Sequence, residues 1–113
     1  MSRSAYNPDR GHIVWIDFSP QAGHEQAGRR PALVVSRGAY NKKVGLAILC
    51  PITSQVKGYP FEVALPDDLP IKGVVLSDQA KSLDWRARRT AYAGTVDQSV
   101  TAEVLKRLGT LLQ

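Results

Sequence analysis

Short runs of apolar residues, separated by glycine, proline and asparagine, cover most of the chain. Their alternation with polar residues and their β-branched and aromatic content are typical of strands. We therefore expect strands over residues 12–18, 31–36, 46–50, 61–65, 73–76 and 91–96. Proline donates no ladder hydrogen bond, so Pro31 should open a strand, and Pro51 and Pro66 should each end one. Five or six strands this short, without helices between them, favour a small antiparallel barrel or sandwich.

The hydrophobic period changes over the last fifteen residues. Helical spacing places five apolar residues on one face, and these are Val100, Val104, Leu108, Leu111 and Leu112. Asp97 or Ser99 is suited to cap the first turn, whereas Gly109 weakens the last turn by about 1 kcal/mol. We expect a C-terminal helix that packs on the barrel. A second, short helix is compatible with residues 39–43.

The connection between the first two predicted strands is unusually long. It spans residues 19–30, whereas most connections have about 4–6 residues, and loops of this length usually serve function. It also concentrates polar chemistry, with His24, Glu25, Gln26, Arg29 and Arg30. This segment is therefore the first place to look for a site.

Length and charge narrow the class of protein. The 113 residues suit a single domain, residues 1–113. Fifteen Lys and Arg against ten Asp and Glu give a formal net charge of +5, and residues 81–89 hold four basic groups against one acidic group. This balance suits a polyanionic partner, either nucleic acid or an acidic protein segment, although a plain solvated surface also explains it.

Several functional classes are disfavoured. The longest nearly apolar run, residues 44–52, is too short for a membrane helix of about 20 residues, and the N-terminus has no apolar region typical of a secretory signal. A soluble, cytoplasmic protein is expected. His12, His24 and Cys50 are the only imidazole or thiol groups and match no metal-binding spacing, so we expect no metal and no other cofactor. Cys50 lies in an apolar run, which is typical of a buried hydrophobe rather than a nucleophile.

RNA cleavage fits the remaining chemistry, because the substrate supplies its own nucleophile. The 2′-hydroxyl can attack the adjacent phosphate, leaving a 2′,3′-cyclic phosphate and a 5′-hydroxyl, if a base, an acid and charge-stabilising donors are present. Glu25 is a candidate base, and the Arg30 guanidinium matches phosphate oxygens. Thr53 and Ser54 offer hydroxyl donors. Taken singly, the same residues are equally explained as loop charges, a surface ion pair and a strand end.

A series of motifs occurs in a characteristic order along residues 6–113. The motifs are the strand from Gly11 to Pro20, the run Glu25-Gln26-Ala27-Gly28-Arg29-Arg30-Pro31, Tyr40-Asn41, Pro51-Ile52-Thr53-Ser54, the run from Lys57 to Val63, and Ser77-Asp78-Gln79 followed by residues up to Arg88. Together they resemble the MazF/PemK family of bacterial toxins. No single motif is diagnostic, but the ordered combination is highly specific.

This resemblance implies a fold, an activity and partners. The fold is a mainly β, SH3-like small barrel of the CcdB/PemK type with a C-terminal helix, and the protein is a homodimer. The activity is that of a metal-independent, sequence-specific endoribonuclease that cleaves single-stranded RNA. The partner is a cognate MazE-like antitoxin that inhibits the toxin through an acidic C-terminal tail.

The resemblance also implies catalytic residues. Arg30 and Thr53 match the family's essential arginine and threonine, and Glu25 matches a glutamate implicated beside them. The chain departs from the pattern at two positions. Leu76 stands where Kid-type members carry an arginine, which favours MazF-like use of Arg30 and argues against a general base two residues further on. Arg29 stands where MazF members commonly have histidine, which argues against an imidazole mechanism there.

Further residues are candidates for RNA contacts. Phe18 is equally well explained as a stacking surface for an unpaired base and as barrel core. The other candidates are Ser54, Gln55 and Gln79 for base edges, and Lys57 and Arg86 for phosphates.

Two alternatives to a ribonuclease remain at this stage. A toxin of related fold inhibits DNA gyrase by binding it, without catalysis. A passive RNA-binding barrel is the other alternative. The arginine–threonine pair and the signature loop argue against the gyrase inhibitor, whereas the passive barrel stays open.

Overall fold

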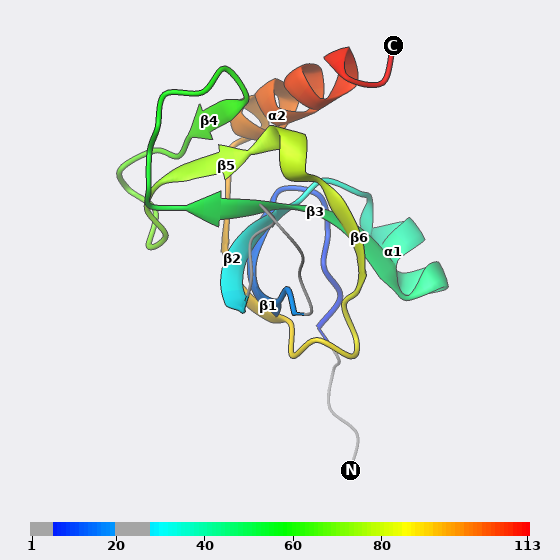
Figure 1. Ribbon diagram of the computed structural model, residues 1–113. Helices are drawn as coiled ribbons and strands as arrows, with labels where there is room; N and C mark the ends of the chain where they lie inside the picture. The colour runs from blue at the N-terminus through cyan, green and yellow to red at the C-terminus, as the bar shows by residue number, and fades with distance from the viewer. Residues whose placement is uncertain (1–5, 20–27) are drawn as a thin grey trace.

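The computed structural model describes residues 6–19 and 28–113, and it is mainly β with a C-terminal helix (Figure 1). In chain order the elements are β1 (His12–Asp17), β2 (Arg29–Val34), α1 (Gly38–Val44), β3 (Leu46–Thr53), β4 (Glu62–Ala64), β5 (Val74–Leu76), the 3-10 turn η1 (Ser77–Gln79), β6 (Lys81–Asp84), β7 (Ala91–Thr95) and α2 (Gln98–Thr110). All six predicted strands and both predicted helices are confirmed, with shifts at their ends.

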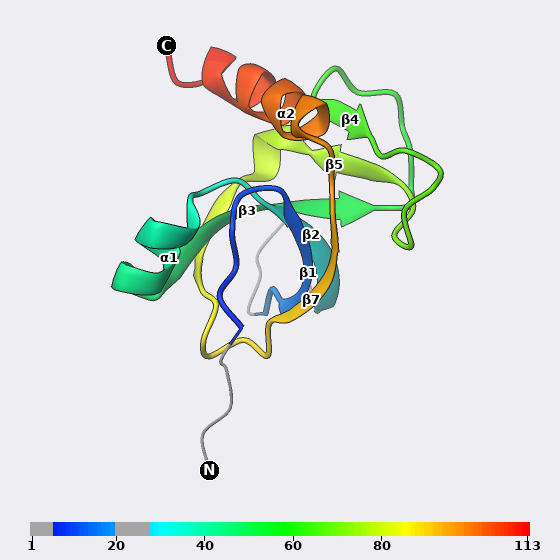
Figure 2. The ribbon, with the colours of Figure 1, turned by 180° about the vertical axis from the view of Figure 1, so that it is seen from behind.

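The strands form one antiparallel sheet whose path turns at β3. The order is β4-β5-β3-β2-β1-β7, and β6 pairs with β3 beside this path. One edge of β3 pairs with β2, while its other edge pairs first with β6, from Leu46 to Leu49, and then with β5, at Ile52 and Thr53. The sheet therefore curls into the expected small barrel-like fold (Figures 1 and 2).

Two hydrophobic clusters lie on the two faces of this sheet. One fills the curled part and comes from β1, β2, β3 and β6; its members are Val14, Ile16, Phe18, Ala32, Val34, Ala47, Leu49, Leu83 and Trp85. The other includes Ile13, Leu33, Cys50 and Ile52, and it is covered by α2, β4 and β5 (Figure 2). Because β3 contributes to both clusters, its sequence is nearly continuously apolar rather than alternating.

Two strands extend through prolines that were expected to bound them. β3 continues through Pro51 to Thr53, and β2 begins before Pro31. Pro51 pairs with Ala32 on one side, and on its other side it falls between the residues paired with β6 and those paired with β5. Pro31 pairs with Trp15, and the recorded pairing with β3 begins only at the next residue. Each proline thus stands where a missing N–H donor costs little.

The strand β6 was not predicted. Its four residues, Lys81–Asp84, include a single large apolar side chain, Leu83, and the surrounding sequence is charged. It forms because it pairs with residues 46–49 of β3 and because Leu83 is buried in the curled part of the sheet. Tertiary pairing, rather than local preference, creates this strand.

The helix α2 begins as predicted but ends earlier. Of the two candidate caps, Asp97 is the one used: its carboxylate accepts a hydrogen bond from the Ser99 amide at 2.9 Å. The Ser99 side chain and, next, this amide lower the pKa of Asp97. Val104 is buried against the sheet. The helix ends at Thr110, so Leu111 and Leu112 lie beyond it and are 50% and 77% exposed; their predicted place on the packed face is wrong. Neither α-helix of the described ranges is both long and apolar enough to cross a membrane.

A buried polar network joins α1 to the barrel. Asn41 is fully buried. Its side-chain amide donates to the carbonyls of Pro8, at 2.9 Å, and Ser36, at 3.2 Å, and it accepts from the Ser36 hydroxyl at 2.5 Å. Its own carbonyl accepts from the indole N–H of Trp85 at 3.0 Å. One asparagine therefore ties together the N-terminal segment, α1 and the end of β6.

We expect Asn41→Ala to lower the free energy of unfolding by about 2–3 kcal/mol, because several buried polar groups lose their partner together. Chemical denaturation measures the change. Lys43→Ala, at an exposed position of the same helix, is the control and should change stability by less than about 0.5 kcal/mol. Equal stability of the two variants would contradict a stabilising role for the network.

Candidate active site

Arg30 and Thr53 lie on neighbouring strands. The recorded register of β2 with β3 pairs Ala32 with Pro51. The ladder between β2 and β3 ends at this pair; counted two residues further along each strand, Arg30 and Thr53 fall at matching positions, which by strand alternation share one face of the sheet. Twenty-three positions of sequence separate the two residues, and α1 lies between their strands in the chain. Arg30 is half-buried and Thr53 is 8% exposed.

The local structure holds Thr53 with its hydroxyl available as a donor. The Thr53 Oγ1 accepts a hydrogen bond from the Gln55 amide at 3.1 Å. A hydroxyl that accepts a bond still has its own proton to donate. Gly73 packs directly on the backbone here: its φ is +123°, and a Cβ at this position would collide with the Thr53 carbonyl oxygen. Glycine is therefore required at position 73 both for its conformation and for this close approach.

A pocket of about 270 Å³ opens beside Thr53. Four of the residues proposed from the sequence line it, namely Thr53, Gln55, Lys57 and Gln79. The other lining residues are Tyr59, Phe61, Glu62, Leu76 and Asp78. The pocket combines two aromatic rings with amide, hydroxyl and charged groups, a composition suited to a polar, planar ligand with a charged backbone.

One side of this pocket is formed by a segment outside any regular element. Residues 54–61, which we call the pocket rim, connect β3 to β4. The Glu62 carboxylate holds the rim by accepting from two consecutive amides, those of Lys57 at 3.1 Å and Gly58 at 2.9 Å. Gly58 has a φ of +82°, which favours glycine. The Glu62 amide in turn donates to the Tyr59 carbonyl at 3.1 Å.

Phe18 belongs to the core. It is 1% exposed and packs in the same cluster as Ile16 and Val34. Its amide donates to the Gly28 carbonyl at 2.9 Å. Of the two roles left open by the sequence, barrel core is the one observed, and the interpretation of Phe18 as a stacking surface is corrected. Burial of a whole aromatic ring is strongly favourable, which explains the outcome.

Arg86 is placed away from Thr53 within the chain. It follows β6, whose Asp84 pairs with Leu46 at the opposite end of β3 from Thr53. Its guanidinium donates to the Lys42 carbonyl at the end of α1, at 2.7 Å, and lies 4.9 Å from the Trp85 ring. Within one chain, therefore, the structure does not group Arg86 with the other proposed contacts.

Other arginines gather instead at the barrel end that carries Arg30. The Arg88 guanidinium donates to the carbonyls of Asp17, at 3.0 Å, and Ser19, at 2.6 Å. The Arg29 guanidinium donates to the Arg89 carbonyl at 2.6 Å. The Ser19 amide and, less strongly, the two arginines at positions 89 and 88 lower the pKa of Asp17. This end of the barrel is thus basic, and Arg29 and Arg88 are anchored there through backbone carbonyls.

Of two further predicted site residues, Glu25 and Ser54, the structure describes only Ser54. Glu25, the candidate base, lies outside the described residues. Ser54 is exposed, directly after the end of β3.

Cys50 is buried, and burial together with the nearby Asp78 carboxylate raises the pKa of its thiol to about 12. The thiol therefore stays protonated at neutral pH, in agreement with its interpretation as a buried hydrophobe.

Sequence reasoning missed several residues of the pocket. Tyr59, Phe61 and Glu62 belong to a run that was noted as a motif, but only Lys57 was selected from it. Asp78 was set aside as a base, yet it lines the pocket. Aromatic residues next to glycine and proline in a polar run of the sequence were the available signal. Within residues 6–19 and 28–113, no group of three or more His, Cys, Asp or Glu side chains is placed to share a metal ion.

The fold and this site define a class of protein. A family model described as the PemK-like, MazF-like toxin of type II toxin–antitoxin systems matches residues 9–112. The chain belongs to this family.

Individual relatives agree with this assignment. The endoribonuclease toxin MazF of Escherichia coli K12 is 52% identical over 93 residues, which cover 82% of this chain and 83% of the relative. The crystal structure of MazF from Deinococcus radiodurans superimposes with a TM-score of 0.93 at 57% identity, covering 96% of this chain and 98% of that one. A MazE–MazF crystal structure from the same organism gives a TM-score of 0.85 at 51% identity, covering 96% and 97%.

Proposed function

We propose that this protein is the toxin of a type II toxin–antitoxin system and a sequence-specific endoribonuclease that cleaves single-stranded RNA, including mRNA. Family membership over residues 9–112 supports the assignment, as does the relative named endoribonuclease toxin MazF. The net charge of +5 suits an RNA substrate. We take residues 1–113 as one toxin domain.

The observation that carries the proposal is the pocket beside Thr53, on a strand that pairs with the strand carrying Arg30. A guanidinium and a hydroxyl on one face can both donate to the oxygens of one phosphate. Gln55 and Gln79 on the pocket wall are suited to base edges, and Lys57 to a neighbouring phosphate. Ser54, exposed beside them, remains a candidate for a base contact.

The reaction follows from the roles assigned to these groups. Glu25 takes the proton of the 2′-hydroxyl, and the 2′-oxygen forms a bond to the adjacent phosphorus. Arg30 and Thr53 stabilise the negative charge that develops on the phosphate oxygens. The bond from phosphorus to the 5′-oxygen breaks, and this oxygen takes a proton from the solvent and leaves as a 5′-hydroxyl, while Glu25 returns its proton to the solvent. The other product carries a 2′,3′-cyclic phosphate, and no water is consumed in this step.

The proposed partners follow from the same family. The MazE–MazF structure from Deinococcus radiodurans is a complex of toxin and antitoxin. We assign this chain a homodimeric state and a cognate MazE-like antitoxin. An acidic C-terminal tail on that antitoxin complements a toxin of net charge +5. Because mRNA is the substrate, we place the protein in the cytoplasm.

The direct test is incubation of the purified protein with total RNA, followed by sequencing of the new 5′ ends. Discrete cleavage at a short common sequence is the expected result. Retention of RNA without cleavage would contradict the proposal and indicate a passive RNA-binding barrel. Absence of both binding and cleavage would also contradict it and would direct attention to gyrase inhibition.

We expect EDTA to leave the cleavage rate unchanged. The 2′-hydroxyl supplies the nucleophile and Arg30 supplies the positive charge, so the proposed reaction requires no metal ion. The measurement is the initial rate with and without a large excess of EDTA over the protein, at constant ionic strength. A loss of activity that added Mg²⁺ restores would refute the metal-independent mechanism.

A further inference from the structure

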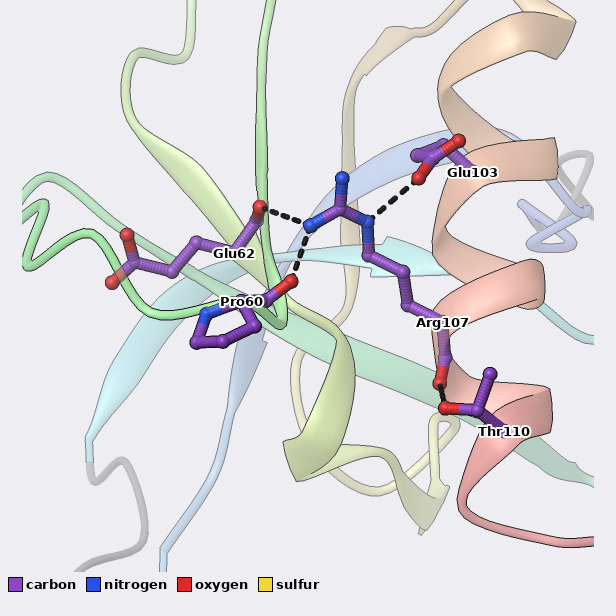
Figure 3. Close-up of polar contacts among 5 residues, drawn as sticks. All are labelled: Pro60, Glu62, Glu103, Arg107 and Thr110. Carbon is purple, nitrogen blue, oxygen red and sulfur yellow. Dashed lines mark hydrogen bonds and ion pairs between the residues drawn. The ribbon is translucent and has the colours of Figure 1, made fainter.

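Arg107 of α2 lies outside the pocket but contacts the backbone that forms its rim (Figure 3). Its Nη1 donates to the carbonyl of Pro60 and, at 3.3 Å, to the carbonyl of Glu62. Its Nε donates to the Glu103 carboxylate, one helical turn earlier, at 2.7 Å. We call this set of contacts the Arg107 bridge. It connects a helix to the point where the pocket rim enters β4.

The Arg107 bridge contacts Glu62, the residue whose carboxylate binds two backbone amides of the pocket rim. The Glu62 carbonyl accepts from Arg107 of α2, and the Glu62 carboxylate accepts from the amides of Lys57 and Gly58. A continuous series of hydrogen bonds therefore runs from Glu103 through Arg107 and Glu62 to the middle of the rim. α2 also packs against η1, which supplies Gln79 to the other pocket wall. One helix thus supports both sides of the pocket.

The physical effect of the bridge is to add a restraint from α2 to a segment that lies outside any regular helix or strand. Each backbone residue that becomes ordered loses substantial conformational entropy, and a ligand that must order a loop binds correspondingly more weakly. The guanidinium contacts two backbone carbonyls at once with a planar array of donors, which fixes their relative position. The hydrogen bond from Arg107 lowers the pKa of Glu103, so this carboxylate is charged at neutral pH and orients the guanidinium.

We propose that Arg107 is a positioning residue for RNA binding: it holds the pocket rim in the conformation that accepts substrate, and it takes no part in the chemistry at Arg30 and Thr53. The proposal rests on the proposed ribonuclease function for its kinetic consequences, but the ordering of the rim does not depend on that function.

The test compares Arg107→Ala, Arg107→Lys and Lys106→Ala. Lys106→Ala removes the same charge from the adjacent, exposed position of α2 and is the matched control. Arg107 and Glu103 have side chains that are 36% and 39% exposed, and exposed pairs contribute little to global stability, so the variants should fold. Circular dichroism and thermal melting check this for each variant.

Two measurements decide the proposal. With a short RNA that contains the mapped cleavage site, Arg107→Ala should raise KM about tenfold and change kcat by less than about threefold, as expected for a lost ground-state contribution to binding. Hydrogen exchange at Lys57 and Gly58 should become faster. Arg107→Lys should give an intermediate KM because a single ammonium group cannot reproduce the planar donor array. Lys106→Ala should match the wild type in both measurements.

Several outcomes would overturn the proposal. Unchanged KM and unchanged hydrogen exchange in Arg107→Ala would show that the rim does not need the bridge. A lower kcat at constant KM would indicate a role other than positioning for binding, and an equal rise of KM in Lys106→Ala would indicate charge alone. If Arg107→Ala does not fold, Arg107→Lys decides by the same criteria. If the wild type does not cleave RNA, the proposed function fails, and hydrogen exchange still decides whether Arg107 orders the rim.

Discussion

Replacing Arg30 with alanine should reduce the rate of RNA cleavage by about 10²–10³-fold, the usual loss when one preorganised donor to a developing oxyanion is removed. The reason is geometric as well as chemical. Arg30 is half-buried on β2, the strand that pairs with β3, and β3 ends at Thr53 beside the pocket. A guanidinium held in place by a sheet stabilises transition-state charge without the reorganisation that water would require. Single-turnover kinetics with a saturating excess of enzyme measures the chemical step directly.

Arg29→Ala is the matched control for this experiment. It removes the same charge from the adjacent residue of β2, but strand alternation places Arg29 on the opposite face from Arg30. Arg29→Ala should therefore retain most of the activity. If folded Arg30→Ala kept more than about a tenth of the wild-type rate, its assignment as the main charge-stabilising group would be wrong.

The second large effect concerns the substrate. An RNA with 2′-deoxyribose at the nucleotide 5′ to the cleaved bond should not be cut at that position, because the attacking nucleophile is then missing. The substitution removes one oxygen and leaves the phosphate, the base and the protein unchanged. Gel analysis of end-labelled oligonucleotides, with product mass determined in parallel, checks both the loss of cleavage and the cyclic phosphate of the normal product.

An oligonucleotide with 2′-deoxyribose at a neighbouring nucleotide serves as the control and should still be cleaved. Binding of the uncleavable RNA, measured by fluorescence anisotropy, should remain close to that of the normal substrate. Cleavage of the bond that follows the deoxyribose would rule out attack by the 2′-hydroxyl. It would also require a different nucleophile, and Cys50 is unsuited to that role because burial raises the pKa of its thiol.

The fold was predictable where a residue's local preference and its tertiary environment agree. β1 and β7 were recognised from β-branched and aromatic residues, and α2 from apolar residues at helical spacing with Asp97 as cap. The exceptions share one cause. β6 has little strand character of its own, and the extensions of β2 and β3 through Pro31 and Pro51 depend on which neighbouring strands pair at those positions. Pairing partners far away in sequence are invisible to a local pattern.

The candidate site shows the same division. Arg30 and Thr53 were selected because of their chemistry and because they match a family motif, and they lie on two strands that pair with each other. Gln55, Lys57 and Gln79 line one pocket, as proposed contacts should, but Phe18 is core and Arg86 caps α1. A phenylalanine at the end of an amphipathic strand has the same local pattern whether it faces solvent or core, and only packing distinguishes the two.

By itself, therefore, the sequence determined the class of fold, the family and the chemistry available at the site, because periodicity, motif order and residue type are local properties. The tertiary structure alone decided which of the charged groups act together. It paired the strand of Arg30 with the strand of Thr53, directed Arg86 to the Lys42 carbonyl at the end of α1, and brought Arg107 from the C-terminal helix to the carbonyls of Pro60 and Glu62. The physical reason is that hydrogen bonds act over about 3 Å, a distance that only the folded chain imposes on residues dozens of positions apart.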